Sequence, residues 1–332
     1  MTILVTGAAG FIGFHVARAL LARGEDVIGI DDLNPYYDPQ LKRARIGALA
    51  NEFNRAFDFH RINFADADAL NATLRDCSFD RIVHLGAQVG VRYSVENPGA
   101  YVQANLVGQL NILELGRSRQ SSHLVYASSS SVYGGNSKLP FRVEDRADRP
   151  VSLYAATKRA DELMCESYSN LFRIPMTGLR FFTVYGPWGR PDMAVWMFTK
   201  AIIAGEPLNI FNHGAMRRDF TFVDDVVAGV VACLDSPPKD DGGEKAGGSV
   251  SPHALYNIGN HRSEKLVRLI EILEEALGRK AVTNLLPMQP GDVVDTFADI
   301  TAIARDHGYQ PRTSIEKGVP QFVEWYKQYH SI

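Results

Sequence analysis

ILVTGAAGFIG, residues 3–13, is the stretch that decides the fold. Its first residues form an apolar run that predicts a buried strand, and apolar residues at helical spacing further on predict a helix. Three glycines, Gly7, Gly10 and Gly13, mark the turn between these two elements. In such a turn, backbone N–H groups and the positive end of the helix dipole face one point, so the stretch predicts an anion site.

Asp31 makes this anion site a predicted dinucleotide site. The glycine spacing is G-x-x-G-x-x-G, and three glycines are also compatible with a plain turn. However, residues 25–30 predict a second strand, and Asp31 follows it about 20 residues after the glycines, where an acid that binds the ribose is expected. Because Asp31 would repel a 2′-phosphate and no Arg stands beside it in the sequence, we expect NAD rather than NADP.

Composition argues against several classes of protein. The 332 residues are 45% apolar with a formal charge of −3, so the basic surface typical of nucleic-acid binding is not expected. No run of about 18 apolar residues predicts a membrane span, and the first strand begins too early for a signal peptide. Three distant cysteines and unpatterned histidines predict neither disulfides nor a metal site. We therefore expect a soluble, cytoplasmic protein with no metal and no nucleic-acid or membrane partner.

Helices and strands alternate through the first half of the chain. Strands are predicted at 57–62, 81–86, 123–128 and 176–182, and helices at 40–50, 67–75, 99–116 and 153–171. This alternation is typical of a Rossmann-type α/β fold, a doubly wound parallel sheet with helices on both faces. The second half predicts helices at 196–204, at 226–234 after an acidic N-cap, and at 265–277. We expect a dinucleotide-binding domain over 1–182, to which part of 220–260 returns, and a smaller α/β lobe over 183–332.

Ligands of such sheets bind at the carboxyl ends of the strands. The residues that follow the predicted strands are therefore candidates for a site, and they include Asn63, Gly86–Gln88, Ser128–Ser131 and Phe182–Thr183. The four serines are compatible with a polar turn, but their hydroxyls also suit a sugar hydroxyl or a carboxylate. Because no Asp–His pair accompanies them, we expect them to donate hydrogen bonds and relay protons rather than act as nucleophiles.

Tyr154 and Lys158 stand four residues apart on one face of a predicted helix. A free tyrosine titrates near pH 10 and is a poor base at pH 7. A nearby ammonium favours the phenolate, and Lys158 can also bind a nicotinamide ribose. A core Tyr and a solvated Lys would give the same pattern. This is the only Tyr-x-x-x-Lys in the chain, however, and its helix follows the serine-rich strand end, so we predict a catalytic pair.

Together these motifs resemble those of the extended short-chain dehydrogenase/reductases. Longer strings resemble the nucleotide-sugar epimerases, above all the UDP-glucuronate 4-epimerases, and are more specific than the glycine motif. They are DDLNPYY (31–37), QVGVRYS (88–94), YGPWGRPDMA (185–194) and RDFTFVDD (218–225). The resemblance covers nearly the whole chain.

The resemblance implies a role for many residues. Tyr154 would be the catalytic base, Lys158 its partner and Ser129 the hydroxyl relay. The residues that would hold NAD are Gly7, Gly10, Phe11, Ile12, Gly13, Asp31, Asn34, Asn63, Phe64, Leu85, Gly86, Ala87, Gln88, Asn105, Tyr154, Lys158 and Phe182. The residues that would hold the UDP-sugar are Arg92, Ser128, Ser129, Ser130, Thr183, Arg190, Arg218 and Asp292.

The chain departs from the family pattern in three places. Asn63 replaces an adenine-binding Asp, although its amide oxygen still accepts a hydrogen bond. Gly86 replaces an Ala, which we expect to be a small change. The basic residue that often precedes the position of Asp292 is missing, which leaves Arg218 and Arg190 as candidates for the diphosphate. Whether Arg190 binds the diphosphate or a sugar carboxylate stays open. In the family, helices equivalent to 99–116 and 153–171 form a homodimer.

The reaction implied by the resemblance is reversible C4 epimerisation of UDP-glucuronate to UDP-galacturonate through a 4-keto sugar. A UDP-glucose/UDP-galactose 4-epimerase and a UDP-glucuronate decarboxylase are the alternatives. Thr183 stands where galactose epimerases have Asn, and Ser131 stands where decarboxylases have Glu. A 4,6-dehydratase would need an acid–base pair at Ser130 and Ser131. A net dehydrogenase would need exchangeable cofactor, and a non-enzymatic NAD-binding protein would not need Tyr154, Lys158 and Ser129.

Overall fold

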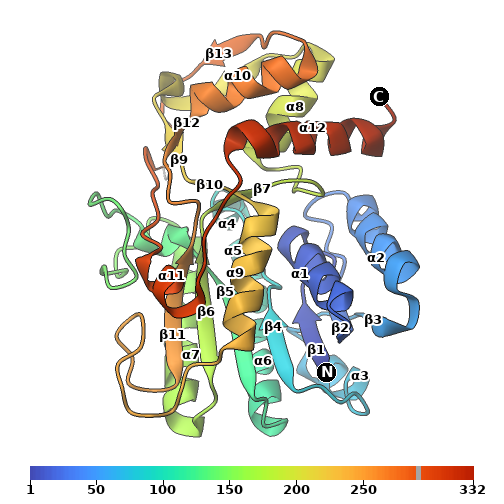
Figure 1. The fold of residues 1–332 in the computed structure, drawn as a ribbon, viewed down its shortest axis with the longest axis vertical. Coiled ribbons are helices and arrows are strands. Elements are labelled where there is room, and N and C mark those ends of the chain that lie inside the picture. Colours follow the sequence, from blue (N-terminus) through green and yellow to red (C-terminus); the bar gives the residue numbers. More distant parts are fainter. Residues whose placement is uncertain (289–292) are drawn as a thin grey trace.

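The computed structural model describes residues 1–288 and 293–332. At its centre lies a parallel sheet in the order β3-β2-β1-β4-β5-β6-β11, which confirms the predicted Rossmann-type α/β class (Figure 1). Because β1 pairs with both β2 and β4, the strand order reverses beside the glycine turn. The strands are β1 (Thr2–Thr6), β2 (Asp26–Asp31), β3 (Phe57–Arg61), β4 (Arg81–His84), β5 (His123–Ser129), β6 (Met176–Phe181) and β11 (His253–Ile258).

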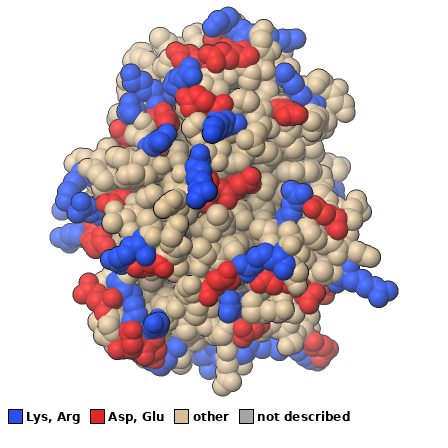
Figure 2. All heavy atoms as spheres, viewed as in Figure 1, with Lys and Arg blue, Asp and Glu red and all other residues tan. Residues whose placement is uncertain are grey.

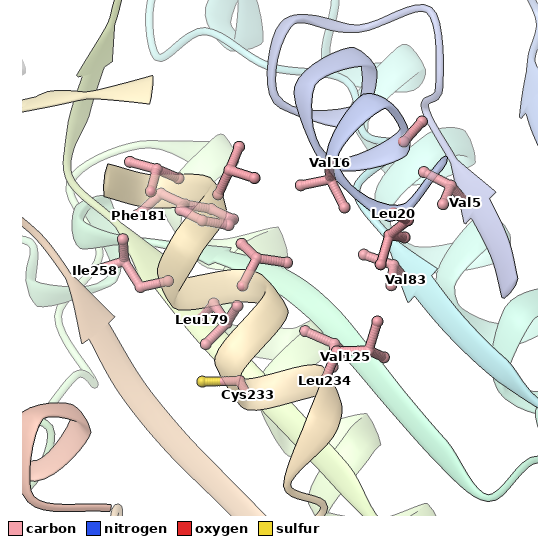
Figure 3. Packing of buried hydrophobic residues seen from close by; sticks show 14 of the residues in the cluster. Val5, Val16, Leu20, Val83, Val125, Leu179, Phe181, Cys233, Leu234 and Ile258 are labelled. Atoms are coloured by element: carbon pink, nitrogen blue, oxygen red, sulfur yellow. The ribbon is translucent and has the colours of Figure 1, made fainter. Parts of the chain in front are cut away.

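Helices cover both faces of this sheet. One face carries α1 (Phe11–Ala22), α2 (Pro39–Phe53), α9 (Val223–Asp235) and α11 (Thr301–His307), and the other carries α3 (Ala67–Thr73), α6 (Gly108–Ser118) and α7 (Leu153–Phe172). Successive strand residues point to opposite faces. Val5 and Val83 thus pack with α1 and α9 (Figure 3), whereas their neighbours Leu4 and Ile82 pack on the opposite face.

A separate hydrophobic core lies above the carboxyl ends of the strands in Figure 1. Its helices are joined by aromatic contacts, such as that of Trp196 with Tyr326, whose ring centroids are 5.1 Å apart. The elements of this region are β7 (Thr183–Tyr185), α8 (Ala194–Ala204), β8 (Leu208–Ile210), β9 (Arg217–Arg218), β10 (Phe220–Phe222), β12 (Glu264–Lys265), α10 (Leu266–Leu277), β13 (Thr283–Leu285) and α12 (Ile315–His330). The exact division into domains of 1–182 and 183–332 stays a prediction.

Some predicted helices differ from the observed ones. The helix predicted at 99–116 consists of α5 (Pro98–Tyr101), a π-helical segment (Val102–Val107) and α6, and the short α4 (Tyr93–Glu96) precedes it. The acidic pair of FTFVDD does not cap α9 from outside, because α9 already begins at Val223. Asp225 instead accepts the backbone N–H groups of Arg312 and Thr313. Helices α11 and α12 were not predicted from the sequence.

The surface mixes both signs of charge. In the face shown in Figure 2, basic and acidic side chains are interspersed. Over residues 1–288 and 293–332, no helix combines the length and the apolar character needed to cross a bilayer. In the same ranges, no three His, Cys, Asp or Glu side chains are grouped so that they would hold a metal ion.

Candidate active site

A cavity of about 590 Å³ opens at the carboxyl ends of the central strands. Its wall includes most of the residues predicted to bind NAD: Gly7, Gly10, Phe11, Ile12, Gly13, Asp31, Asn34, Asn63, Phe64, Leu85, Gly86, Ala87, Gln88, Tyr154, Lys158 and Phe182. It also includes most of those predicted to bind the sugar nucleotide: Ser128, Ser129, Ser130, Thr183, Arg190 and Arg218. The fold thus brings both sets together, while the role of each residue stays a prediction.

The glycine turn is packed too tightly for side chains. Gly7 has a φ of +68°, and a Cβ added there would lie 2.7 Å from the backbone nitrogen of Gly86. A Cβ at Gly13 would lie 2.1 Å from the carbonyl oxygen of Gly7. Among the residues that the structure describes, no side chain caps the N-terminus of α1, which begins directly after Gly10. The first N–H groups of α1 therefore remain available for a pyrophosphate.

Asp31 ends β2 and is nearly buried, with 6% of its surface exposed. Its Oδ1 accepts the N–H of Leu33 at 2.8 Å and lies 3.5 Å from Nζ of Lys42. Burial raises the pKa of Asp31, and the cationic Lys42 opposes this rise. Lys42 comes from α2 and was not among the predicted site residues. A carboxylate at the end of β2 is nevertheless placed to accept hydrogen bonds from ribose hydroxyls.

Gly86, which stands where the family pattern has Ala, lies against the ring of Phe64. A Cβ at Gly86 would lie 2.6 Å from the ring of Phe64, and one at Gly108 would lie 2.3 Å from the same ring. Phe64 is therefore held between two glycines in the cavity wall. Nearby, Oδ1 of Asn63 accepts the N–H of Ala65 at 2.9 Å, which leaves one lone pair of that oxygen for an adenine amino group.

Tyr154 and Lys158 lie in the first turns of α7, whose N-terminus is capped by the hydroxyl of Ser152. Nζ of Lys158 donates to the carbonyl of Ala127 at 3.1 Å and to Oδ2 of Asp161 at 3.0 Å. Burial alone would lower the pKa of Lys158, but the Asp161 carboxylate, together with Tyr154 and Cys165, more than offsets burial, and the pKa is raised. Lys158 is therefore a cation in the cavity wall. Asp161 stands three residues after Lys158, a spacing that indicates an ion pair on one helix face, but Asp161 was not among the predicted residues.

The serines at the end of β5 differ in their hydrogen bonds. The hydroxyl oxygen of Ser129 accepts the hydroxyl of Ser131 at 2.9 Å and its N–H at 3.2 Å, so the proton of Ser129 is not used in either bond. Ser128 instead donates to Oε1 of Glu162 at 2.6 Å. Glu162 also pairs with Arg180 through two hydrogen bonds of 2.8 and 2.9 Å. Ser128 therefore supports the cavity wall and does not offer its proton to a ligand.

Arg190 is a cationic side chain on the sugar side of the cavity. Its Nε donates to Asp192 at 3.0 Å, and the Tyr36 hydroxyl donates to the same carboxylate at 3.1 Å. Tyr36 was not among the predicted site residues, yet it lines the cavity. Arg218 lies in the same wall and donates to the carbonyl oxygen of Val294 at 3.1 Å.

Two predicted residues, Asn105 and Arg92, do not line the cavity. Asn105 is 2% exposed and does not reach the cavity wall, because its amide bonds both backbone groups of Gln88 and the Thr157 hydroxyl. It therefore supports the wall from behind rather than contacting a ligand. Arg92 also lies outside the wall, with its guanidinium 5.0 Å from the ring centroid of Phe211. Asp292 lies outside the described residues.

Comparisons with known proteins agree with this geometry. The NAD dependent epimerase/dehydratase family matches residues 3–259. The probable UDP-glucuronate 4-epimerase of Rhizobium meliloti (strain 1021) is 47% identical over 334 residues, 99% of this chain and 97% of that protein. UDP-glucuronate 4-epimerase 4 of Arabidopsis thaliana is 46% identical over 100% of this chain and 76% of that protein. The crystal structure of UDP-glucuronic acid 4-epimerase from Bacillus cereus in complex with UDP-glucuronic acid and NAD is 36% identical, with a TM-score of 0.88 over 99% of this chain and 100% of that chain.

Proposed function

Because the chain belongs to the NAD dependent epimerase/dehydratase family, we propose that it interconverts UDP-glucuronate and UDP-galacturonate by epimerisation at C4. The observation that carries the proposal is one cavity that joins a glycine cradle, the Tyr154–Lys158 pair and short hydroxyl side chains. Relatives that bear the name UDP-glucuronate 4-epimerase, at 47% and 46% identity, support it.

The cavity fits NAD. The uncapped N-terminus of α1 and the close-packed Gly7 and Gly13 suit a pyrophosphate, and Asp31 suits the hydroxyls of the adenosine ribose. Lys158 would hold the second ribose with the one donor that its bonds to Ala127 and Asp161 leave. Bound NAD would supply the hydride acceptor for C4 and the hydride donor for the return to the other face of the sugar.

In this proposal Tyr154 is the group that moves the proton. It takes the proton of the C4 hydroxyl as C4 is oxidised and returns it when C4 is reduced. Lys158 is held as a cation by Asp161 and stabilises the phenolate form of Tyr154. Ser129 accepts hydrogen bonds from Ser131, so its own proton is available to the C4 oxygen, which it orients toward Tyr154.

The same site explains why a uronate would keep its carboxylate. Oxidation at C4 makes a β-keto acid, which loses CO₂ when its carboxylate bond aligns with the carbonyl π-system. Ser130 and Thr183 line the cavity and offer short hydroxyl donors that would hold the carboxylate away from this alignment. Ser131 cannot serve as the acid or base of a decarboxylase, because its hydroxyl bonds Ser129 and does not titrate near neutral pH.

Two further parts of the proposal concern assembly and location. Apolar side chains are exposed along the Val102–Val107 segment, α6 and α7: Val102, Leu110, Leu163, Leu171 and Phe172. A second copy of the chain would cover this face in a homodimer of packed helices. The three cysteines are free thiols in the structure, which supports the cytoplasm as the location.

Incubation of the purified protein with UDP-glucuronate, followed by separation of the products, tests the proposed function. UDP-galacturonate should form without added cofactor, with little UDP-pentose, and the reverse reaction should start from UDP-galacturonate. Protein-bound NAD should remain near one per chain. UDP-pentose as the main product, or faster turnover of UDP-glucose than of UDP-glucuronate, would overturn the proposal in favour of a decarboxylase or a hexose epimerase.

A further inference from the structure

Arg45 of α2 is a fully buried residue whose guanidinium joins the glycine turn to the segment before Arg190. Its Nη1 donates at 2.8 Å to the carbonyl of Ala9, which lies inside the glycine turn. Its Nη2 donates to the carbonyls of Trp188 at 2.6 Å and Gly189 at 3.2 Å. Nη1 also donates to the hydroxyl of Tyr37 at 2.7 Å. One side chain therefore connects segments that are about 180 residues apart in the sequence.

The surroundings of Arg45 are unusual for a buried cation. Within residues 1–288 and 293–332, no carboxylate forms an ion pair with Arg45, and its Nε has no hydrogen-bond partner. Burying a charge without a counter-ion costs free energy, which hydrogen bonds to neutral oxygens offset only in part. Three of the four acceptors are main-chain carbonyls, so Arg45 fixes the path of the backbone.

The segment that Arg45 holds leads directly to Arg190. Trp188 has a φ of +61°, a conformation that a bulky residue keeps only when its surroundings impose it. Its ring packs on Phe14 of α1 at 5.3 Å, and Nε2 of His15 lies 2.9 Å from the carbonyl oxygen of Pro187. Arg190 follows two residues after Trp188 and lines the cavity. The place of Arg190 therefore depends on contacts with the glycine turn and its helix.

We propose that Arg45 is a positioning residue, which sets Arg190 for binding of the sugar nucleotide by holding the Trp188–Gly189 main chain against the glycine turn. The inference rests on the proposed function only for the choice of ligand. When the guanidinium of Arg45 is removed, the Trp188–Gly189 main chain can shift, and Arg190 is no longer held in position. The groups that hold NAD keep theirs, because the glycine turn is also closed by its own tight packing.

A double-mutant cycle between Arg45 and Arg190 tests the proposal. Both are changed singly and together, Arg45→Lys and Arg190→Ala, in a Tyr154→Phe background that binds UDP-glucuronate without turnover, and the affinity is measured by calorimetry. Lysine keeps the charge but is a point donor that cannot span the carbonyls. Arg45→Lys should weaken binding about tenfold when Arg190 is present and less than about twofold when it is absent. Additive losses, or unchanged affinity, would overturn the proposal.

Controls separate this result from a general structural defect. Arg43→Lys, at an exposed position of the same helix, should leave the affinity unchanged, and the NAD content of every variant should match the parent. If Arg45→Lys does not fold, His15→Phe removes a second side-chain hydrogen bond to this segment and is judged by the same two outcomes. If the parent does not bind UDP-glucuronate, the proposed function is contradicted. If the parent binds but the losses of affinity in the double-mutant cycle are additive, only the role of Arg45 is contradicted.

Discussion

Nζ of Lys158 lies 3.0 Å from Oδ2 of Asp161, and the two side chains form an ion pair buried beneath the cavity. Oδ1 of Asp161 has no hydrogen-bond partner among the described residues. Burial raises the pKa of Asp161 to about 6, although Lys158 opposes the rise. The Lys158 ammonium therefore favours the ionised form of the Asp161 carboxylate at neutral pH. In turn, the carboxylate keeps the buried ammonium charged.

Removal of that carboxylate should change the pH dependence of turnover. The raised pKa of Lys158 keeps its ammonium up to alkaline pH in the parent. In Asp161→Asn, the main group that opposes burial is gone and this pKa falls, so the ammonium is lost as the pH rises through the lower value. We expect kcat to fall roughly tenfold for each pKa unit of the shift on the alkaline side. Profiles of kcat from about pH 6 to 9 that superimpose on the parent would contradict this, and exposed Asp68→Asn is the control.

Tyr154→Phe should slow turnover strongly and leave the binding of substrate and cofactor unchanged. The change removes only the phenol oxygen, and general base catalysis contributes roughly 10²–10⁴-fold. We expect kcat to fall by that factor, with UDP-glucuronate affinity and NAD content close to those of the parent. Activity comparable to the parent would remove Tyr154 from the mechanism.

Thr183→Val should impair the uronate reaction more than NAD binding. Valine has nearly the same shape but no hydroxyl, and Thr183 lines the sugar side of the cavity. Loss of a hydrogen bond to a carboxylate costs about 1.5–3 kcal/mol, or about 10–150-fold in kcat/KM. Product analysis should also show a larger share of UDP-pentose. An unchanged kcat/KM with unchanged products would show that Thr183 does not hold the carboxylate.

Glu162→Gln should destabilise the fold in a pH-dependent way. Glu162 is buried; burial alone would raise its pKa, but Arg180, together with Ser128 and Arg159, outweighs burial and holds the pKa below 4.5. Its stabilising contribution is thus present above about pH 4.5 and is lost as the pH falls through the lowered pKa. We expect urea unfolding at pH 7 to show a loss of about 3–5 kcal/mol, because Arg180 is left without a counter-ion.

The difference in stability between parent and Glu162→Gln should narrow in acid. The exposed pair Glu114–Arg117 offers a matched control, and Glu114→Gln should have little effect. A loss below about 1 kcal/mol at pH 7, or a difference that stays constant with pH, would contradict the expectation.

Leu163→Glu should convert the proposed homodimer into monomers. Leu163 is 55% exposed on α7, and a carboxylate there would be desolvated in the helix-packed interface. Light scattering coupled to size exclusion should report half the mass of the parent. Val267→Glu, on α10 and 47% exposed, should leave the mass unchanged. A monomeric parent, or a variant that stays dimeric, would place the interface elsewhere or exclude it.

Local pattern was enough to predict the class of fold and much of the site. The glycine turn, the strand before it and Asp31 form one supersecondary unit, so their spacing in the chain sets their spacing in space. Tyr154 and Lys158 share a helix face for the same reason. Alternating helices and strands predicted the parallel sheet and, with it, the edge at which Ser129 and Thr183 meet the glycine turn.

Long-range packing decided the rest. Lys42 and Arg45 belong to a helix with no site signal, and only its docking on the sheet brings them to Asp31 and to the Trp188 carbonyl. Asn105 is turned from the cavity because its amide satisfies buried groups that no spacing rule identifies. Part of 220–260 was expected to return to the dinucleotide-binding domain, but no sequence pattern predicted that 253–258 pairs with β6 as the edge strand β11. Sequence patterns report contacts between residues a few positions apart. The contacts described here join distant segments, which come together only when the hydrophobic cores form.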